Sequence, residues 1–428
     1  MTIHPVTAQP VTARPTPDAG PASELPEPLY GPDFGSYDAH EVAWLLSDLS
    51  SVELEAPTEE REEAIQSGGA HYAESLPVEY QPTQEYQDLF HSALRASATR
   101  LAHAVGVVTD LVLAERGERA VLVSLARAGT PIGVLMRRWA SYAHGLNLPH
   151  YAASIVRGRG IDQVALAYLA AHHRPEDIMF VDGWTGKGAI SRELAAAVEQ
   201  ANVALGLSGT GLTGAGLAGA DLGDDERAGF SADLAVLADP GHCAELFGTR
   251  EDYLIPSACL NSTVSGLVSR TVLNDALIGP GMFHGAKFYA DLAPADVSAE
   301  FCDVVSMQFS EVAASVAETI AARQAAPAPE ITWAGWKAVE AISAEYGLGD
   351  VNLVKPGVGE TTRVLLRRVP WKILVRADAS AELAHVRLLA AQRGVEVVEV
   401  EDLPYSCVGL IHPQFTRGAT GADGTASR

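Results

Sequence analysis

A short stretch in the middle of the chain, IMFVDGWTGKGAI, carries the residue types with the most evident chemical use. Its apolar run predicts a buried strand that ends at Asp182, and a glycine-rich turn then leads into a helix. Backbone N–H groups of such a turn, together with the helix N-terminus, can cradle a phosphate. The Asp182 carboxylate suits ribose hydroxyls or a Mg²⁺ shell. The predicted ligand residues of this loop are Asp182, Gly183, Thr185, Gly186, Lys187 and Gly188.

Two further segments can bring positive charge to the same ligand. SLARAGTP places Arg127 at a strand end among small residues, where a guanidinium can hold phosphate oxygens through paired hydrogen bonds. VRGRGID carries Arg157 and Arg159 among glycines, a composition typical of a mobile basic loop that closes over an anion. Polar groups that follow LIPSACL add Asn261 and Arg270 as predicted substrate contacts. The other residues predicted to bind phosphate are Ala128, Gly129 and Thr130.

Alternating strands and helices must position these residues. Apolar runs at 121–125, 177–182 and 233–239 predict buried strands, and amphipathic segments at 132–143 and 190–200 predict helices between them. A long helix is predicted later in the chain, from about 294 to 325. The alternating order favours a parallel sheet with helices on its faces. Because ligands of such sheets bind beyond the carboxyl ends of the strands, we expect the site at that edge.

Composition divides the chain into several parts. Frequent prolines with few large apolar side chains predict a disordered N-terminal tail, and helical patterns, the first over 37–49, predict a helical extension after it. The predicted parts are a disordered tail at 1–34, a helical extension of the enzyme domain at 35–100, an α/β domain at 101–325 with a Gly-rich insertion at about 203–228, a linker at 326–332, a small α/β domain at 333–415 and a disordered tail at 416–428.

Charge, cysteine content and hydropathy limit the kind of protein. The 428 residues include 54 acids and 30 bases, and the net charge of -24 argues against a protein whose main role is to coat nucleic acid. A hydrophobic fraction of 47% excludes wholesale disorder. Four cysteines without a CxxC pair favour a reducing compartment, and no 18-residue apolar run predicts a membrane span. We therefore expect a cytoplasmic protein, with homodimer formation left open.

The loop at Asp182 resembles the phosphoribosyl pyrophosphate signature of type I phosphoribosyltransferases, in which two acids and a Thr/Gly-rich loop follow four apolar residues. Asp182 matches the first acid and Gly188 the loop glycine, whereas Gly183 replaces the second acid and Lys187 a threonine. The resemblance implies a type I phosphoribosyltransferase-like parallel sheet flanked by helices. It also implies that phosphoribosyl pyrophosphate binds with Mg²⁺, and that Asp182 and Arg127 are the catalytic residues. It implies no metal site built from protein ligands alone.

Longer segments are similar to one particular family. GSYDAHEVAWLLSDL, EREEAIQSGGAHYAESLP and LIPSACLNSTVSGLVSRTVLN resemble the phosphoribosyltransferase-like proteins of bacterial tellurite-resistance and stress-response gene clusters, a family also labelled "cysteine protease StiP". The likeness covers about residues 35–320. It implies an enzyme that makes a nucleoside-like or ribosylated metabolite.

Two other functions stay open at this level. The glycine at position 183 permits a catalytically inactive nucleotide-sensing or RNA-binding protein. A cysteine protease would need a Cys–His pair, but the side chains of the adjacent His242 and Cys243 diverge on a strand and lie about 100° apart on a helix. His71 is a more distant partner in the sequence. Small buried cysteines are the simpler interpretation of Cys243, Cys259 and Cys302.

The C-terminal part has a different charge from the whole. Residues 351–376 carry six basic side chains and one acid, and KPGVGE predicts a turn followed by a helix N-terminus suited to phosphate. The stretch resembles the G-x-N-E-x-T-K motif of pelota/L7Ae-type RNA-binding domains, with Gly359 in place of the asparagine and Arg363 in place of the lysine. The resemblance implies an α/β/α domain that binds RNA. The residues implied to bind RNA are Lys355, Gly357, Gly359, Glu360, Thr362, Arg363 and Arg367.

Overall fold

A computed structural model describes residues 25–56, 73–79, 81–207, 228–367, 369–379 and 383–412. Its centre is a parallel sheet with the strand order β1-β6-β5-β8-β9-β10, to which a short strand, β7, adds beside β6 in the antiparallel direction. The bounds are β1 Ala43–Leu45, β5 Val121–Ala126, β6 His150–Val156, β7 Gly160–Ile161, β8 Ile178–Trp184, β9 Leu234–Ala238 and β10 Leu246–Thr249. The predicted parallel sheet and its strands at 121–125, 177–182 and 233–239 are confirmed.

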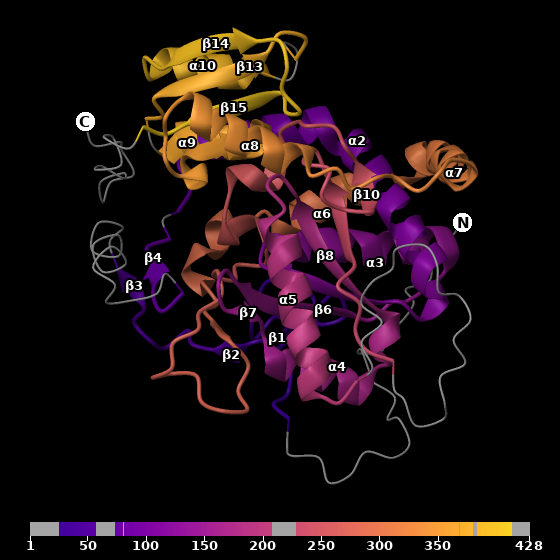
Figure 1. The fold of residues 1–428 in the computed structure, drawn as a ribbon. Coiled ribbons are helices and arrows are strands. Elements are labelled where there is room, and N and C mark those ends of the chain that lie inside the picture. The colour runs from indigo at the N-terminus through magenta and orange to yellow at the C-terminus, as the bar shows by residue number, and fades with distance from the viewer. Residues whose placement is uncertain are drawn as a thin grey trace.

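Helices cover both faces of this sheet (Figure 1). Alternate strand residues belong to different hydrophobic clusters, because successive side chains of a strand point to opposite faces. Leu122 and Val181 pack with α2, α3, α6 and α7 on one face, whereas Val123 and Phe180 pack with α4 and α5 on the other. The bounds are α2 Gln84–Arg116, α3 Thr130–His144, α4 Gln163–His172, α5 Ala189–Ala204, α6 Ser298–Ser306 and α7 Phe309–Ala325.

The N-terminal part differs from its prediction. The expected helix over 37–49 is wrong, because residues 43–45 form the edge strand β1. Ala43, Trp44 and Leu45 are each 0% exposed, and a continuous run buried on both sides is typical of a strand in a covered parallel sheet. The folded part also begins before residue 35, inside the predicted disordered tail, since an isolated β-bridge joins Leu29 to Trp44. Four short strands form two small parallel pairs: β2 Ser47–Asp48 pairs with β11 Gly285–Ala286, and β3 Glu55–Ala56 pairs with β4 Leu76–Pro77.

Two long helical segments also depart from expectation. The helix α2 runs unbroken through residue 100, where the sequence predicted a boundary between the helical extension and the α/β domain. By length and composition alone, this helix could cross a membrane. Yet 61% of its apolar window is buried inside the molecule, as in the core helix of a soluble protein. The helix expected from about 294 to 325 is divided into α6 and α7 after a 3-10 turn. The 3-10 turns are η1 Gly117–Arg119, η2 Pro175–Asp177, η3 Pro256–Cys259, η4 Ser262–Val264, η5 Ala290–Ala295 and η6 Val351–Leu353.

The C-terminal part forms a second α/β unit around a four-stranded sheet with the order β12-β15-β13-β14. The pair β13–β14 is parallel, and β15 is antiparallel to both β12 and β13. Its elements are α8 Ala334–Glu345, β12 Val354–Pro356, α9 Gly357–Arg367, β13 Lys372–Arg376, α10 Ala384–Gln392, β14 Glu396–Val400 and β15 Cys407–Leu410. The predicted small α/β domain is confirmed.

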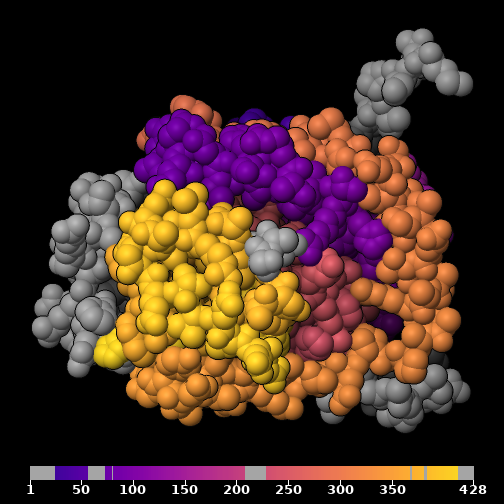
Figure 2. Space-filling view, turned by 90° about the horizontal axis from the view of Figure 1, so that it is seen from above, coloured from indigo at the N-terminus to yellow at the C-terminus, as the bar shows by residue number. Residues whose placement is uncertain are grey.

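The two domains pack directly on each other. Seen from above, the C-terminal domain lies against α2 (Figure 2). The main hydrophobic cluster of the first domain continues into α9, where it includes Val358 and Leu365. Several predicted parts lie outside the described residues, including most of the N-terminal tail, the Gly-rich insertion between 208 and 227, and the C-terminal tail from 413.

Candidate functional site

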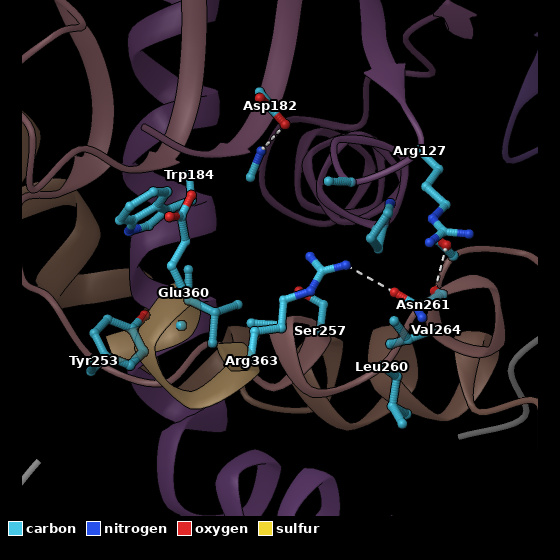
Figure 3. A pocket seen from close by; sticks show the side chains of 17 residues that line it. Arg127, Asp182, Trp184, Tyr253, Ser257, Leu260, Asn261, Val264, Glu360 and Arg363 are labelled. Atoms are coloured by element: carbon cyan, nitrogen blue, oxygen red, sulfur yellow. Dashed lines mark hydrogen bonds between the residues drawn. The ribbon is translucent and has the colours of Figure 1, made fainter. Parts of the chain in front are cut away.

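A cavity of about 220 Å³, which we call the interdomain pocket, lies at the carboxyl edge of the central sheet. The ends of β5 and β8 supply Arg127, Asp182 and Trp184, and the segment around η3 and η4 forms a second wall. The helix α9 of the C-terminal domain completes the pocket with Glu360 and Arg363 (Figure 3). Both domains therefore build one site.

The pocket joins residues that the sequence assigned to separate ligands. From the predicted substrate site it contains Arg127, Ala128, Asp182, Gly183 and Asn261. From the predicted RNA site it contains Gly359, Glu360 and Arg363. The Arg363 guanidinium donates to Asn261 Oδ1 over 2.9 Å, which links the two groups across the domain boundary. The ligand roles of these residues stay predictions.

Asp182 is the pocket residue with the most altered acidity. Burial raises the pKa of its carboxyl to about 7, although the Gly183 N–H donates to Oδ1 over 2.7 Å and works in the opposite direction. A carboxyl that titrates near neutral pH can accept or donate a proton in a reaction. Asp182 is therefore the group in this pocket best suited to proton transfer.

Asp182 gives a pH-dependent stability that can be measured. Its pKa is higher in the folded state than in the unfolded chain, so the stability that it contributes is complete below about pH 4 and is lost as the pH rises through 7. We expect Asp182→Asn to be more stable than the natural protein at pH 8 by at least about 2 kcal/mol, because each pKa unit corresponds to about 1.4 kcal/mol. Urea unfolding at pH 4.5 and pH 8 measures this, and equal pH dependence of the two proteins would contradict it.

Arg127 already has a protein partner. Its Nη1 lies 2.6 Å from Glu79 Oε1, and Glu79 Oε2 accepts a hydrogen bond from Ser262 Oγ over 2.8 Å. Burial raises the pKa of Glu79, but Arg127 and Ser262 outweigh it and leave that pKa below its usual value. Glu79 could not be predicted as part of the site from the sequence, because it lies 48 residues from Arg127 and belongs to no motif.

The glycine loop after β8 does not form an open phosphate cradle in this structure, and the ligand roles predicted for its residues stay predictions. The C-terminal domain fills its place: the Tyr405 hydroxyl donates to the Gly186 carbonyl oxygen over 3.1 Å, and Lys187 Nζ donates to the Val351 carbonyl oxygen over 2.9 Å. A side chain at Gly188 would collide with the ring of Trp333. The loop is glycine-rich because another part of the protein approaches it closely.

A buried acid that the sequence did not single out holds this region together. Asp239 follows β9 and is 0% exposed. Its Oδ1 accepts from Thr185 Oγ1 over 2.5 Å and from the Cys243 N–H over 2.8 Å, and its Oδ2 accepts from the Ala244 N–H over 3.1 Å. Asp239 thus fixes the loops that follow β8 and β9.

The other predicted substrate contacts lie away from the pocket lining. Arg157 donates to Asn352 Oδ1 over 3.0 Å, and Arg159 lies 4.0 Å from Glu74. Arg270 donates to the Ser75 carbonyl oxygen over 2.8 Å. Gly129 and Thr130 are packing positions at the start of α3, where a side chain at Gly129 would collide with the Val181 carbonyl.

The predicted RNA-binding stretch faces the first domain, so part of it is not exposed to solvent. The Val358 N–H at the start of α9 donates to Asp252 Oδ1 over 2.9 Å, and a side chain at Gly359 would press on Ala258. Thr362 Oγ1 is hydrogen-bonded to His385 within the domain over 2.9 Å. Lys355 is in β12 and Arg367 ends α9.

All four cysteines are buried and free of disulfides. Burial raises the pKa of Cys243 and of Cys259 to about 12, and it raises the pKa of Cys302 and Cys407 further. The Cys243 thiol donates to the carbonyl oxygens of Gly186 and Gly241. No hydrogen bond joins a cysteine to a histidine in the part of the chain that the structure describes, and His71 lies outside it.

The fold and the site define a two-domain α/β protein in which a second domain closes the edge of the central sheet. A family model described as "Tellurite-like stress resistance cysteine protease StiP" matches residues 35–306, and one described as "PELOTA RNA binding domain" matches residues 333–413. "Cysteine protease StiP" of Acinetobacter baylyi (strain ATCC 33305 / BD413 / ADP1) is 34% identical over 394 residues, which cover 88% of this chain and 94% of that protein. The chain belongs to the StiP family, and the resemblances of its sequence to this family and to pelota-type RNA-binding domains are confirmed.

The expectation of a phosphoribosyltransferase is wrong. The family and the relative are both named for a cysteine protease, and the loop expected to cradle pyrophosphate is packed beneath the C-terminal domain. The Mg²⁺ expected with that reaction stays a prediction. Within the described ranges, no group of three or more His, Cys, Asp or Glu side chains could hold a metal ion.

Proposed function

We propose that the chain is a thiol peptidase of a tellurite-like stress response, with Cys243 as its nucleophile, and that the arrangement described above is its closed form. The observation that carries this proposal is the position of Cys243 in the fold of a chain whose family is named for a cysteine protease. This thiol lies at the carboxyl edge of the parallel sheet, in the turn after β9. Reactive groups of α/β enzymes gather at this edge.

Burial is the main cause of the high pKa of the Cys243 thiol, and contact with water would remove this cause. The nearby Asp239 carboxylate also raises this pKa, whereas Arg192 and Arg250 act to lower it. The thiolate is the nucleophilic form of cysteine, so the closed form is unreactive. Burial and Arg250 also lower the pKa of the adjacent His242, which keeps its imidazole neutral and able to accept a proton at pH 7.

The proposed reaction has two steps. The Cys243 thiolate attacks the carbonyl carbon of a peptide bond, the C–N bond breaks, and the leaving amine takes up a proton. Water then hydrolyses the thioester, which releases the carboxylic acid and restores the thiol. Both steps need a rearranged site in which the thiol and a base meet the substrate.

The other thiols fit this role less well. Cys259 lies in η3, where Ala258 and Leu260 on either side line the pocket while Cys259 itself packs in the hydrophobic core. Cys302 donates toward the Pro131 carbonyl oxygen inside the first domain, and Cys407 is 0% exposed in β15. These positions are typical of cysteines that only fill space.

The test is release of peptides from a denatured protein substrate by the full chain, before and after alkylation of Cys243. We expect slow release by the untreated protein, in proportion to its open fraction. Release should stop after alkylation. Full activity after complete modification of Cys243, or no release at any concentration, would contradict the proposal.

We also propose that the C-terminal domain binds RNA. The match to the RNA-binding family over residues 333–413 supports this, as does the basic run at 351–376. Phosphate contacts dominate such binding, so its affinity should fall as salt rises. The free thiols agree with a reducing cytoplasm as the place of action.

A further inference from the structure

One carboxylate of the first domain is held by two backbone N–H groups of the second. Asp252 is 7% exposed and lies at the N-terminus of α9. Its Oδ1 accepts from the Val358 N–H over 2.9 Å and its Oδ2 accepts from the Ser406 N–H over 2.8 Å. Ser406 Oγ also donates to the Asp252 carbonyl oxygen over 2.8 Å. The contact fastens the two domains together.

This contact occupies the surface where α9 would meet an anion. The first N–H groups of a helix lack partners within the helix and, with the helix dipole, attract negative charge. Gly357 begins α9 with a φ of 80°, and a Cβ there would lie 3.0 Å from Asp252 Oδ1 and 2.7 Å from the Trp184 ring. The carboxylate therefore sits where a phosphate bound to α9 would sit.

The same domain covers the proposed nucleophile. Trp333 packs against Gly188, and a Cβ at Gly188 would also lie 3.0 Å from Cys243 Sγ. The Trp333 N–H donates to the carbonyl oxygen of His242 over 3.1 Å. Arg192, which lowers the pKa of Cys243, lies 4.4 Å from the ring centre of Trp336 in α8. Separating the domains would expose both the α9 N-terminus and Cys243.

We propose that RNA opens this enzyme, because an RNA phosphate and Asp252 compete for the N-terminus of α9. This inference rests on the RNA binding and the thiol chemistry proposed above. Binding of RNA by the open form draws the equilibrium away from the closed form and so uncovers Cys243. The coupling is reciprocal, since a contact that holds the domains closed also weakens RNA binding.

The direct test is Asp252→Asn in the full chain, with Glu251→Gln as the matched control. Asparagine keeps the shape of Asp252 but lacks its charge. Its side-chain NH2 group would face one of the two backbone N–H groups, so one of the two hydrogen bonds would be replaced by a contact between two donors. Glu251 is the neighbouring acid, and it pairs instead with Arg100 of α2 over 2.7 Å. Each variant removes one negative charge, but only Asp252→Asn weakens the interdomain contact.

Two readouts are measured, namely affinity for a labelled RNA hairpin with an internal bulge and the rate of Cys243 alkylation without RNA. We expect Asp252→Asn to bind the hairpin about tenfold more tightly and to be alkylated at Cys243 about tenfold faster, since apparent affinity scales with the open fraction. Glu251→Gln should match the natural protein in both. Added hairpin should speed alkylation of the natural protein.

A second variant protects the test against misfolding. Tyr405→Phe removes only the hydroxyl that donates to Gly186, and it should change both readouts in the same direction by a smaller factor. If all four proteins had equal RNA affinity and equal alkylation rates, the proposed competition between Asp252 and RNA would be contradicted. The proposal that the C-terminal domain binds RNA would still stand. If no protein bound the hairpin, both RNA binding and RNA-driven opening would be contradicted. Since neither readout needs peptidase activity, failure of the peptidase proposal is seen separately.

Discussion

Cys243→Ala is expected to reduce peptide release at least about 100-fold, because removal of a covalent nucleophile leaves only the catalysis that binding and polar groups provide. Cys259→Ala and Cys302→Ala remove the same atoms from buried positions and should retain the rate within about threefold. Initial rates of peptide release by the three purified variants at equal concentration measure this. The comparison is matched, since each variant replaces the SH group of one buried cysteine by a hydrogen atom.

If Cys259→Ala lost the activity and Cys243→Ala kept it, Cys259, which lies beside the interdomain pocket, would be the nucleophile instead. Similar losses in all three variants would indicate a general effect on folding, and their far-UV spectra and unfolding midpoints distinguish that case. The first outcome contradicts the assignment of Cys243, and so do similar losses in three variants whose spectra and unfolding midpoints show that they are folded.

Asp239→Ala is expected to lower the free energy of unfolding by about 3 to 5 kcal/mol, the usual cost of removing one member of a buried polar cluster. The variant leaves the Thr185 hydroxyl and two backbone N–H groups without their acceptor in a buried place. Arg250, whose Nε lies 3.6 Å from Asp239 Oδ2, also loses this ionic contact. Urea unfolding followed by circular dichroism measures the change.

A surface acid provides the control for Asp239. Asp378 pairs with Arg376 over 2.5 Å, but its side chain is 75% exposed. Ion pairs of this kind contribute about 0 to 1 kcal/mol. Asp378→Ala should therefore leave the stability nearly unchanged, and an equal effect of the two variants would contradict the structural role given to Asp239.

The sequence predicted the central sheet because its strands are buried on both sides. The runs that became β5, β8 and β9 are short, apolar and followed by small or polar residues, a pattern that few other structures share. The same reasoning placed Arg127 and Asp182 at one sheet edge, where both line the interdomain pocket. It failed at 37–49, since a strand buried on both faces and a helix with a broad apolar face look alike over a few residues.

The sequence could not predict how the domains dock. Glycines in the loop at 186–188 indicate close approach of some group, but the pattern does not distinguish a phosphate from a neighbouring domain. In this protein the group is Tyr405 and Trp333 of the C-terminal domain. Asp252 and Glu79 likewise belong to no local motif, because their partners are 106 and 48 residues away along the chain. Contacts of this kind depend on the assembled structure.

The proposed function depends on Cys243 as the nucleophile. The most direct measurement is mass-spectrometric mapping of the site that reacts with a peptide chloromethyl ketone in the full chain. We predict one adduct per molecule, on Cys243, formed faster than with the simple thiol reagent iodoacetamide at the same concentration. An adduct on Cys259, Cys302 or Cys407 while Cys243 stays unmodified would contradict the account.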